Sequence, residues 1–203
     1  MNAETDAAAT AGKDAKGDGD KPHFAQMKTD YDGLTPGSQA ELRRVTAPGE
    51  LLFKPAFYRL SQGRTGPGMQ RVIFVLPFVA QMEEAKLQKL AKEEKRDPKW
   101  VMPPGRALAA ADAGETKFAD GKGEKLTSVG MRLMQIKRLE EPLDLIQFRR
   151  LVQHLTKSHS LLFDWPLLAW GLLAWGNPEK GKNKILRDYF RAKYVPSKKG
   201  KNK

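Results

Sequence analysis

The sequence lacks cysteine altogether and contains only three histidines among its 203 residues. The absence of cysteine excludes disulfide bonds, thiolate catalysis and cysteine-ligated zinc sites, and it suits a reducing cytoplasm. The N-terminus lacks the basic region and apolar run of a signal peptide. The most apolar stretch, residues 161–175, is shorter than the roughly 20 residues of a membrane-spanning helix and contains Asp164 and Pro166. We therefore expect a cytoplasmic protein that contacts no membrane.

Patterns that carry chemistry are also missing. His154 and His159 have no carboxylate at ligand spacing beside them, and His23 lies in a stretch expected to be disordered. The glycine-rich segment 63–68 lacks the Lys and Ser or Thr that complete a phosphate-binding loop. Rossmann glycine patterns and nucleophile elbows are absent as well. The sequence thus predicts no catalytic residue, no cofactor and no bound metal.

Positive charge is what the sequence has in excess. Lys and Arg number 36 against 24 Asp and Glu, which gives a net charge of +12. The first 30 residues hold four Lys and six acidic residues, so 32 basic and 18 acidic groups follow residue 30. Such an excess over a folded region is the electrostatic signature of a nucleic-acid-binding protein, and it fits RNA and DNA equally.

The hydrophobic periodicity is helical, and alternating strand patterns of useful length are rare. We predict an all-α fold in which two small helical bundles form one compact, elongated unit. The first residues are too poor in apolar side chains to offset the entropy of ordering them. The expected organisation is a disordered tail over 1–30, an N-terminal helical half over 31–96, an irregular segment over 97–128, a C-terminal helical bundle over 129–194 and a basic tail over 195–203.

Start signals place helices in the N-terminal half. Ser38 and Glu41 form a capping-box pattern, which predicts a helix that begins at Ser38. Two short helices with proline in the first turn are expected to follow it. A longer helix is predicted over residues 69–96 with a kink at Pro77, and residues 72–76 are also compatible with a buried strand.

The C-terminal half has clearer signals. Apolar residues recur at helical spacing over 129–136 and again over 145–155, and Pro142 separates the two segments, so we predict a helical hairpin. Asp164 is placed to cap a helix over 165–175 that is apolar on nearly every side. A helix of this kind is expected to be buried.

Arginines occupy the expected outer faces of these helices. With Leu145 and Phe148 directed inward, a rotation of 100° per residue places Arg150 on the opposite side of its helix and Arg149 at the flank. Arg138 lies opposite the apolar positions of the preceding helix by the same reasoning. A guanidinium group can bind phosphate oxygens through two parallel hydrogen bonds and can also stack on an unpaired base.

Several segments in a fixed order resemble the CasB family, the small subunit of the type I-E CRISPR surveillance complex called Cascade. The most specific are the motif ELRRV at 41–45 and PAFYRL at 55–60, and the others are PGEL at 48–51, GRALA at 105–109, DLIQFRRL at 144–151 and DWPLL at 164–168. Together they cover most of residues 31–194. The loop around Arg64 is shorter here than in the family.

The resemblance implies a non-enzymatic, all-helical protein present as two copies arranged head to tail. Its implied partners are the other Cascade subunits with their guide RNA and the target and non-target DNA strands of the R-loop. The implied role is to help hold the R-loop and its displaced strand. Carried over by position, the family's basic residues proposed to touch nucleic acid correspond to Arg44, Arg64, Arg132, Arg138 and Arg150.

Two other functions stay open on the sequence. A metal-dependent nuclease would use Glu83, Glu84 and Asp112, although neighbouring acids on a helix face different directions and are more typical of a solvated surface. A helical adaptor would instead use the basic face to bind an acidic protein.

Overall fold

The computed structural model describes residues 24–95, 102–112, 126–159 and 161–195. These residues contain helices and no β-strand, and an isolated bridge between Gln81 and Phe163 is their only β-type pairing. The predicted all-α fold is confirmed. No helix in the described ranges is long and apolar enough to cross a membrane.

The N-terminal half consists of short helices, most of which have proline in the first turn. Proline suits the first turn because its missing N–H would have no partner there, and it occupies this turn in α2, η1, α3 and α4. The elements are α1 (Phe24–Asp32), α2 (Pro36–Arg44), the 3-10 helix η1 (Pro48–Phe53), α3 (Pro55–Ser61), α4 (Pro67–Val75) and the 3-10 helix η2 (Leu76–Phe78).

The C-terminal half is built around a hairpin and a buried helix. Its elements are α6 (Pro104–Ala111), α7 (Ser128–Arg138), α8 (Leu143–His159), α9 (Trp165–Leu173) and α10 (Lys182–Tyr194), and α5 (Glu84–Glu94) lies between the halves in the chain. The predicted hairpin of α7 and α8 is confirmed, as is Asp164 as the cap of α9, where its carboxylate accepts a hydrogen bond from the Leu167 amide at 3.3 Å.

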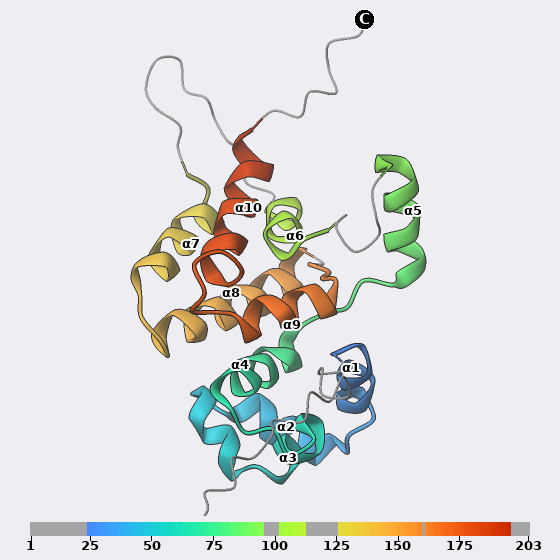
Figure 1. Cartoon of the computed structure of the whole chain (residues 1–203), viewed down its shortest axis with the longest axis vertical. Helices are drawn as coiled ribbons and strands as arrows, with labels where there is room; N and C mark the ends of the chain where they lie inside the picture. Colours follow the sequence, from blue (N-terminus) through green and yellow to red (C-terminus); the bar gives the residue numbers. More distant parts are fainter. Residues whose placement is uncertain (1–23, 96–101, 113–125, 160, 196–203) are drawn as a thin grey trace, which may run out of the picture.

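The two halves lie end to end and share one core. Figure 1 shows α1 to α4 at one end of the elongated molecule and α6 to α10 at the other, with α5 at the side opposite α7. Contacts of α4 and α1 with α9, and of η2 with α8, join the halves. A single hydrophobic cluster therefore runs from Phe24 on α1 to Tyr189 on α10.

The predicted tail extends too far into the chain. Residues 24–30 belong to α1, which buries Phe24, Met27 and Tyr31 along one face. The indole N–H of Trp165 also donates to the Phe24 carbonyl at 2.8 Å, which holds the start of α1 against α9. The tail prediction is thus wrong for residues 24–30, and its remainder lies outside the described residues.

The helix predicted over residues 69–96 is broken rather than kinked. Pro77 lies in the first turn of η2, and the chain after it is extended and pairs with the segment before α9. The Met82 amide donates to the Phe163 carbonyl at 2.7 Å, and the Phe163 amide donates to the Ala80 carbonyl at 3.0 Å. The alternative strand over 72–76 is also wrong, because these residues are helical.

Two further local predictions need correction. The cap of α2 is Thr35 rather than Ser38, and its hydroxyl accepts from the Ser38 amide at 3.3 Å, so the helix begins most of a turn earlier. The helix α9 is not buried on every side, because Trp170 is 45% exposed, with its ring packed edge-on against Phe24 at 5.1 Å between centroids.

The segment 97–128, expected to be irregular, contains the closest helix contact of the fold. A Cβ atom added to Gly105 on α6 would lie 2.1 Å from the carbonyl oxygen of Ile185 on α10. Only glycine therefore permits this approach of the two backbones. Arg106 on the same helix donates to the Glu94 carboxylate at 2.7 Å, which attaches the end of α5 to α6.

Candidate nucleic-acid interface

The α7–α8 hairpin carries three of the arginines predicted to bind nucleic acid. Val129, Leu133 and Ile136 bury one face of α7 and leave Arg132 and Arg138 exposed. The buried face of α8, formed by residues such as Leu145, Phe148 and Val152, leaves Arg150 exposed on the other side. None of these three arginines forms an ion pair or side-chain hydrogen bond with the residues that the structure describes, so their donors face solvent.

A buried ionic contact fixes the turn of this hairpin. Asp144 at the start of α8 is 2% exposed and accepts hydrogen bonds from the Lys182 ammonium at 2.7 Å and from the Trp175 indole at 2.9 Å. The Lys182 ammonium also donates to the carbonyl of Leu139 at 2.8 Å, just after α7. One lysine of α10 thus holds both the end of α7 and the start of α8.

Arg149 joins the hairpin to the N-terminal half. Its guanidinium donates to the carbonyl of Val45, the residue that ends α2, at 2.6 Å. The same group lies over the rings of Phe74 and Phe78, at 4.1 and 4.8 Å from their centroids. Burial and, after it, the charge of Arg150 lower the pKa of Arg149. Arg149 is therefore a structural anchor between the hairpin and the N-terminal half.

The anchor brings two of the predicted arginines to one junction. Arg44 directly precedes Val45 and Arg150 directly follows Arg149, so the hydrogen bond between Arg149 and Val45 places both beside the contact of α2 with α8. Both are exposed and make no ion pair or side-chain hydrogen bond with the described residues. We call the surface around Arg44 and Arg150 the α2–α8 junction.

The charge of Glu50 interacts with that of Arg149 at this junction. Its carboxylate accepts from the Thr46 amide at 3.0 Å and from the Thr46 hydroxyl, and these hydrogen bonds, more than any charge, lower the pKa of Glu50. The charges of Lys54 and Arg149 act in the same direction. The hydrogen bonds direct the carboxylate toward Thr46, while Arg44 and Arg150 stay without a carboxylate partner among the described residues.

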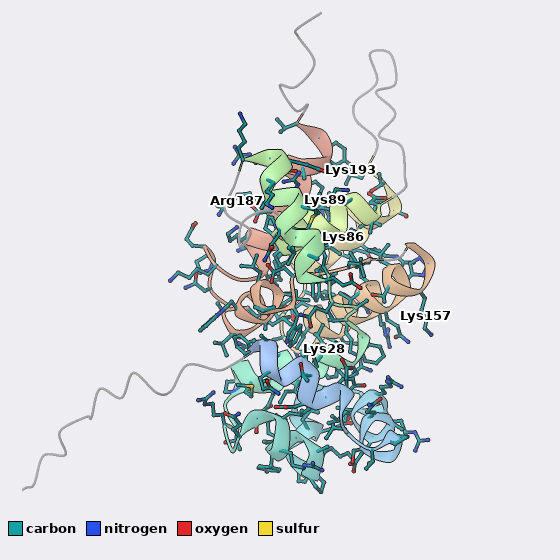
Figure 2. The ribbon with its side chains drawn as sticks, turned by 90° about the vertical axis from the view of Figure 1, so that its right-hand side faces the viewer. Lys28, Lys86, Lys89, Lys157, Arg187 and Lys193 are labelled. Atoms are coloured by element: carbon teal, nitrogen blue, oxygen red, sulfur yellow. The ribbon has the colours of Figure 1, made fainter. Side chains whose placement is uncertain are left out.

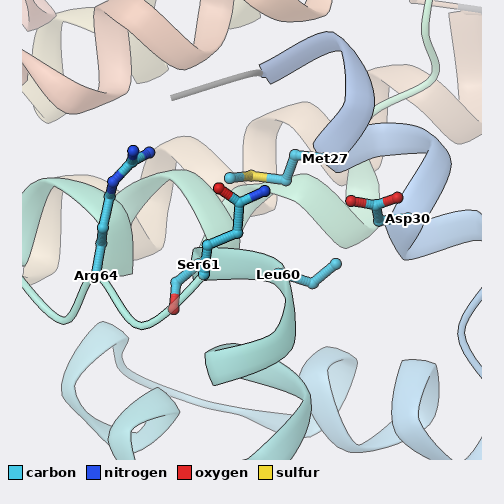
Figure 3. Close-up of a pocket in the computed structure, with 6 residues that line it drawn as sticks. Met27, Asp30, Leu60, Ser61 and Arg64 are labelled. Carbon is cyan, nitrogen blue, oxygen red and sulfur yellow. The ribbon is translucent and has the colours of Figure 1, made fainter. Parts of the chain in front are cut away.

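The structure places Arg64 apart from the other four arginines. It follows Gly63, whose φ of 80° makes the tight turn between α3 and α4, and it is only half-exposed. Figure 3 shows Arg64 at a small pocket that is also lined by Met27 and Asp30 of α1. Four of the five predicted arginines are thus distributed over the hairpin and the α2–α8 junction, and Arg64 lies against α1.

Other basic residues lie on the side opposite α7. Figure 2 shows Lys86 and Lys89 along α5 and Lys28 on α1 below them. Lys28 is neutralised by Asp32 at 2.5 Å, whereas Lys86 and Lys89 are exposed and form no ion pair within the described part of the chain. Helix α5 itself carries as many glutamates as lysines, so it has no net excess of positive charge.

Of the carboxylates in the nuclease hypothesis, that of Asp112 is engaged in contacts within the fold. The Asp112 carboxylate is buried and accepts hydrogen bonds from the hydroxyls of Thr127 and Tyr189, each at 2.6 Å. Burial, followed by the contact with Asp112, raises the pKa of Tyr189. Lys193 donates to the Asp112 carbonyl at 2.6 Å, so this aspartate joins the end of α6 to α7 and α10. Across the described residues, no group of three or more His, Cys, Asp or Glu could hold a metal.

Comparison with known proteins decides the family. Residues 38–190 match the family model described as CRISPR-associated protein Cse2. The chain belongs to the Cse2 family. Among relatives, the CRISPR system Cascade subunit CasB of Escherichia coli (strain K12) is 30% identical over 158 residues, which cover 77% of this chain and 85% of that protein. The resemblance predicted from the sequence motifs is therefore confirmed.

A solved structure shows the same fold. One chain in the crystal structure of E. coli Cascade bound to a PAM-containing double-stranded DNA target matches with a TM-score of 0.62 and 25% identity, covering 86% of this chain and 98% of that chain. The Cse2 region begins within α2 and ends within α10, so it contains all five predicted arginines and the anchor Arg149 but not α1.

Replacing Arg149 and Arg150 in separate variants tests whether Arg149 anchors the hairpin. Arg149→Met is expected to lower the free energy of unfolding by about 1 to 2 kcal/mol, because the buried Val45 carbonyl loses its donor and Phe74 loses the guanidinium. Arg150→Met, the matched control on the same helix, should change it by less than about 0.5 kcal/mol, since this side chain is exposed and has no partner to lose among the described residues. Urea denaturation of both variants measures the difference, and equal losses would contradict the anchoring role.

Proposed function

We propose that this Cse2-family chain is a non-catalytic subunit of a type I-E CRISPR surveillance complex and that it helps to hold the R-loop. Its basic helix faces bind the phosphates of the displaced DNA strand and of the neighbouring nucleic acid without reading the bases. Base pairing with the guide RNA then selects the sequence, as in RNA-guided systems generally. The E. coli relatives, a Cascade subunit and a chain of a DNA-bound Cascade, support this role.

The observation that carries the proposal is the exposure of four arginines that have no partner among the described residues. Arg44, Arg132, Arg138 and Arg150 are exposed, and none is neutralised by a carboxylate of the described residues. Holding a guanidinium free of acidic neighbours leaves its full charge available for a phosphate, to which it can donate two parallel hydrogen bonds. In the assembly that the family resemblance implies, two such copies would lie head to tail and would extend the basic surface along a strand.

Two alternative functions have less support from the structure. A helical adaptor would use the same arginines to bind an acidic protein, and it would show little affinity for DNA that depends on salt. A nuclease would need Asp112 as a metal ligand or general base. The Asp112 carboxylate instead accepts hydrogen bonds from Thr127 and Tyr189, which stabilise the fold. Cleavage of single-stranded DNA that requires magnesium and is lost in Glu84→Ala would restore that alternative.

Co-purification tests the assembly. The tagged full-length chain, expressed with the remaining surveillance subunits and a guide RNA, is expected to bring down those subunits and the RNA with two copies of itself in each assembly. Native mass spectrometry of the purified complex gives the stoichiometry. Recovery of the chain alone, or with an acidic protein and no guide RNA, would contradict the proposal.

A further inference from the structure

One aromatic side chain stands out from the surface of the N-terminal half. Phe53, the last residue of η1, is 81% exposed, the largest exposed fraction among the large apolar side chains that the structure describes. A phenyl ring that stays in water on folding contributes none of the roughly 1.5–3 kcal/mol that burial of such a side chain provides. The fold therefore gives no structural reason for phenylalanine at this position.

A second partly exposed ring, that of Tyr58, is held at the end of η1. The Tyr58 hydroxyl donates to the carbonyl of Leu52, the residue before Phe53, at 2.9 Å. The Tyr58 ring also packs edge-on against the buried Phe57 at 5.4 Å between centroids, and 42% of Tyr58 is exposed. We call Phe53 and Tyr58 the aromatic pair.

The aromatic pair adjoins the α2–α8 junction. In a 3-10 helix, side chains three residues apart lie on the same face, so Phe53 shares a face of η1 with Glu50, about 6 Å further along the axis. Glu50 is bonded to Thr46, two residues after Arg44, and its charge interacts with that of Arg149. The face of η1 that presents Phe53 therefore also carries Glu50, which its hydrogen bond with Thr46 and the charge of Arg149 connect to the α2–α8 junction.

The charges around the aromatic pair favour a nucleic acid over an acidic or apolar protein surface. Residues 41–60 contain four basic and two acidic side chains. Both acids are engaged: Glu50 accepts from Thr46, and Glu41 pairs with Lys54 at 3.5 Å. The cations of residues 41–60 that form no ion pair with the described residues are thus arginines in the same segment as an exposed ring. Cations together with an exposed ring are the combination that binds unpaired nucleotides by holding phosphates and stacking bases.

We infer that Phe53 is a stacking platform for an unpaired base of the strand whose phosphates are held at Arg44 and Arg150. Tyr58 supports the platform and offers the next ring. Stacking of this kind accepts any base, because every base has an aromatic face, so it adds affinity without sequence choice. This inference rests on the proposed function, since it assigns the base contact to the site at which phosphates are bound.

A comparison of two ligands tests the stacking. The full-length chain is titrated at low salt with a fluorescently labelled oligothymidylate and with an abasic sugar-phosphate chain of equal length and charge. Phe53→Ala is expected to weaken binding of the oligothymidylate roughly 5- to 100-fold and to leave binding of the abasic chain unchanged. Phe53→Leu should behave like the alanine variant, because it keeps apolar volume but has no ring, and Phe53→Trp should retain the affinity.

The variants distinguish failure of this inference from failure of the proposed function. Arg150→Glu should weaken binding of both ligands, because both carry phosphates. If Arg150→Glu acts on both ligands while Phe53→Ala changes neither, or changes both equally, the stacking role is overturned and the proposed function stands. If Arg150→Glu changes neither ligand, the proposed function fails. If Phe53→Ala instead abolishes co-purification with the other subunits and leaves oligothymidylate binding unchanged, Phe53 is a protein contact and the inference is overturned.

Discussion

Reversing the charge of Arg132, Arg138 and Arg150 together is expected to weaken retention of target DNA by the assembled complex on the order of a thousandfold. Each lost hydrogen bond between a charged donor and a phosphate costs about 1.5 kcal/mol, and the three losses together give this factor. The three side chains are exposed and have no partner among the described residues, so their replacement by glutamate removes no internal contact. Assembly and melting temperature should therefore stay close to those of the unaltered chain.

A matched control is available on α5. Lys86, Lys89 and Lys92 are also exposed on one helix, and replacing them by glutamate changes the net charge by the same amount on the side opposite α7. Gel shifts with the complete target duplex should show nearly normal retention for this variant. Equal weakening by the two triple variants would show that net charge alone matters, and full retention by the arginine variant would contradict the assigned surface.

Removal of the Asp144 carboxylate is the second change with a large expected effect. Asp144→Ala should lower the free energy of unfolding by about 3 to 5 kcal/mol, because the Lys182 ammonium keeps its charge in a largely buried position and the Trp175 indole loses its acceptor. Since Lys182 also holds the end of α7, the hairpin that presents Arg132 and Arg138 should loosen. Urea denaturation measures the loss of stability.

The partner of Asp144 provides the control for this prediction. Lys182→Met alone leaves a buried carboxylate without its cation and should also be strongly destabilising. Asp144→Ala combined with Lys182→Met removes both charges, so the double variant should be more stable than the sum of the two single losses implies. Additive losses would show that the pair is not coupled, contrary to the 2.7 Å contact.

The α7–α8 hairpin shows how far local sequence information reaches. Its two apolar stripes and Pro142 predict two antiparallel helices, and the same 3.6-residue period predicts which arginines face outward. Arg138 and Arg150 are exposed as expected. The cap by Asp164 is equally local, because the carboxylate and the amide that it accepts from are three residues apart.

Contacts between distant segments account for what the sequence could not predict. Arg149 is adjacent to Arg150 and flanks the same helix, yet its hydrogen bond reaches Val45, 104 residues earlier in the chain. Helical spacing predicts that Arg149 lies at the flank of α8, but it does not predict that the Val45 carbonyl lies opposite. Asp112 is likewise an unremarkable acid in the sequence, and only the packing of α6, α7 and α10 brings Thr127 and Tyr189 to its carboxylate.

Competing local signals explain the errors at the N-terminus. Thr35 followed by Pro36 is as good a helix start as Ser38 with Glu41, and the earlier start adds most of a helical turn. Phe24, Met27 and Tyr31 have helical spacing, but the polar composition of the first 30 residues outweighs these few apolar side chains in a sequence average. Docking against Trp165 of α9 supplies the stability that α1 lacks by itself.

The salt dependence of strand binding tests the central claim most directly. If the exposed arginines bind phosphates, the slope of log K against log salt concentration should be shallower by about 0.7 for each arginine neutralised on a single strand. For the full-length chain and an oligothymidylate, the account predicts a slope that is shallower by about two in the triple variant Arg132→Gln, Arg138→Gln, Arg150→Gln. An unchanged slope in this variant would contradict the account.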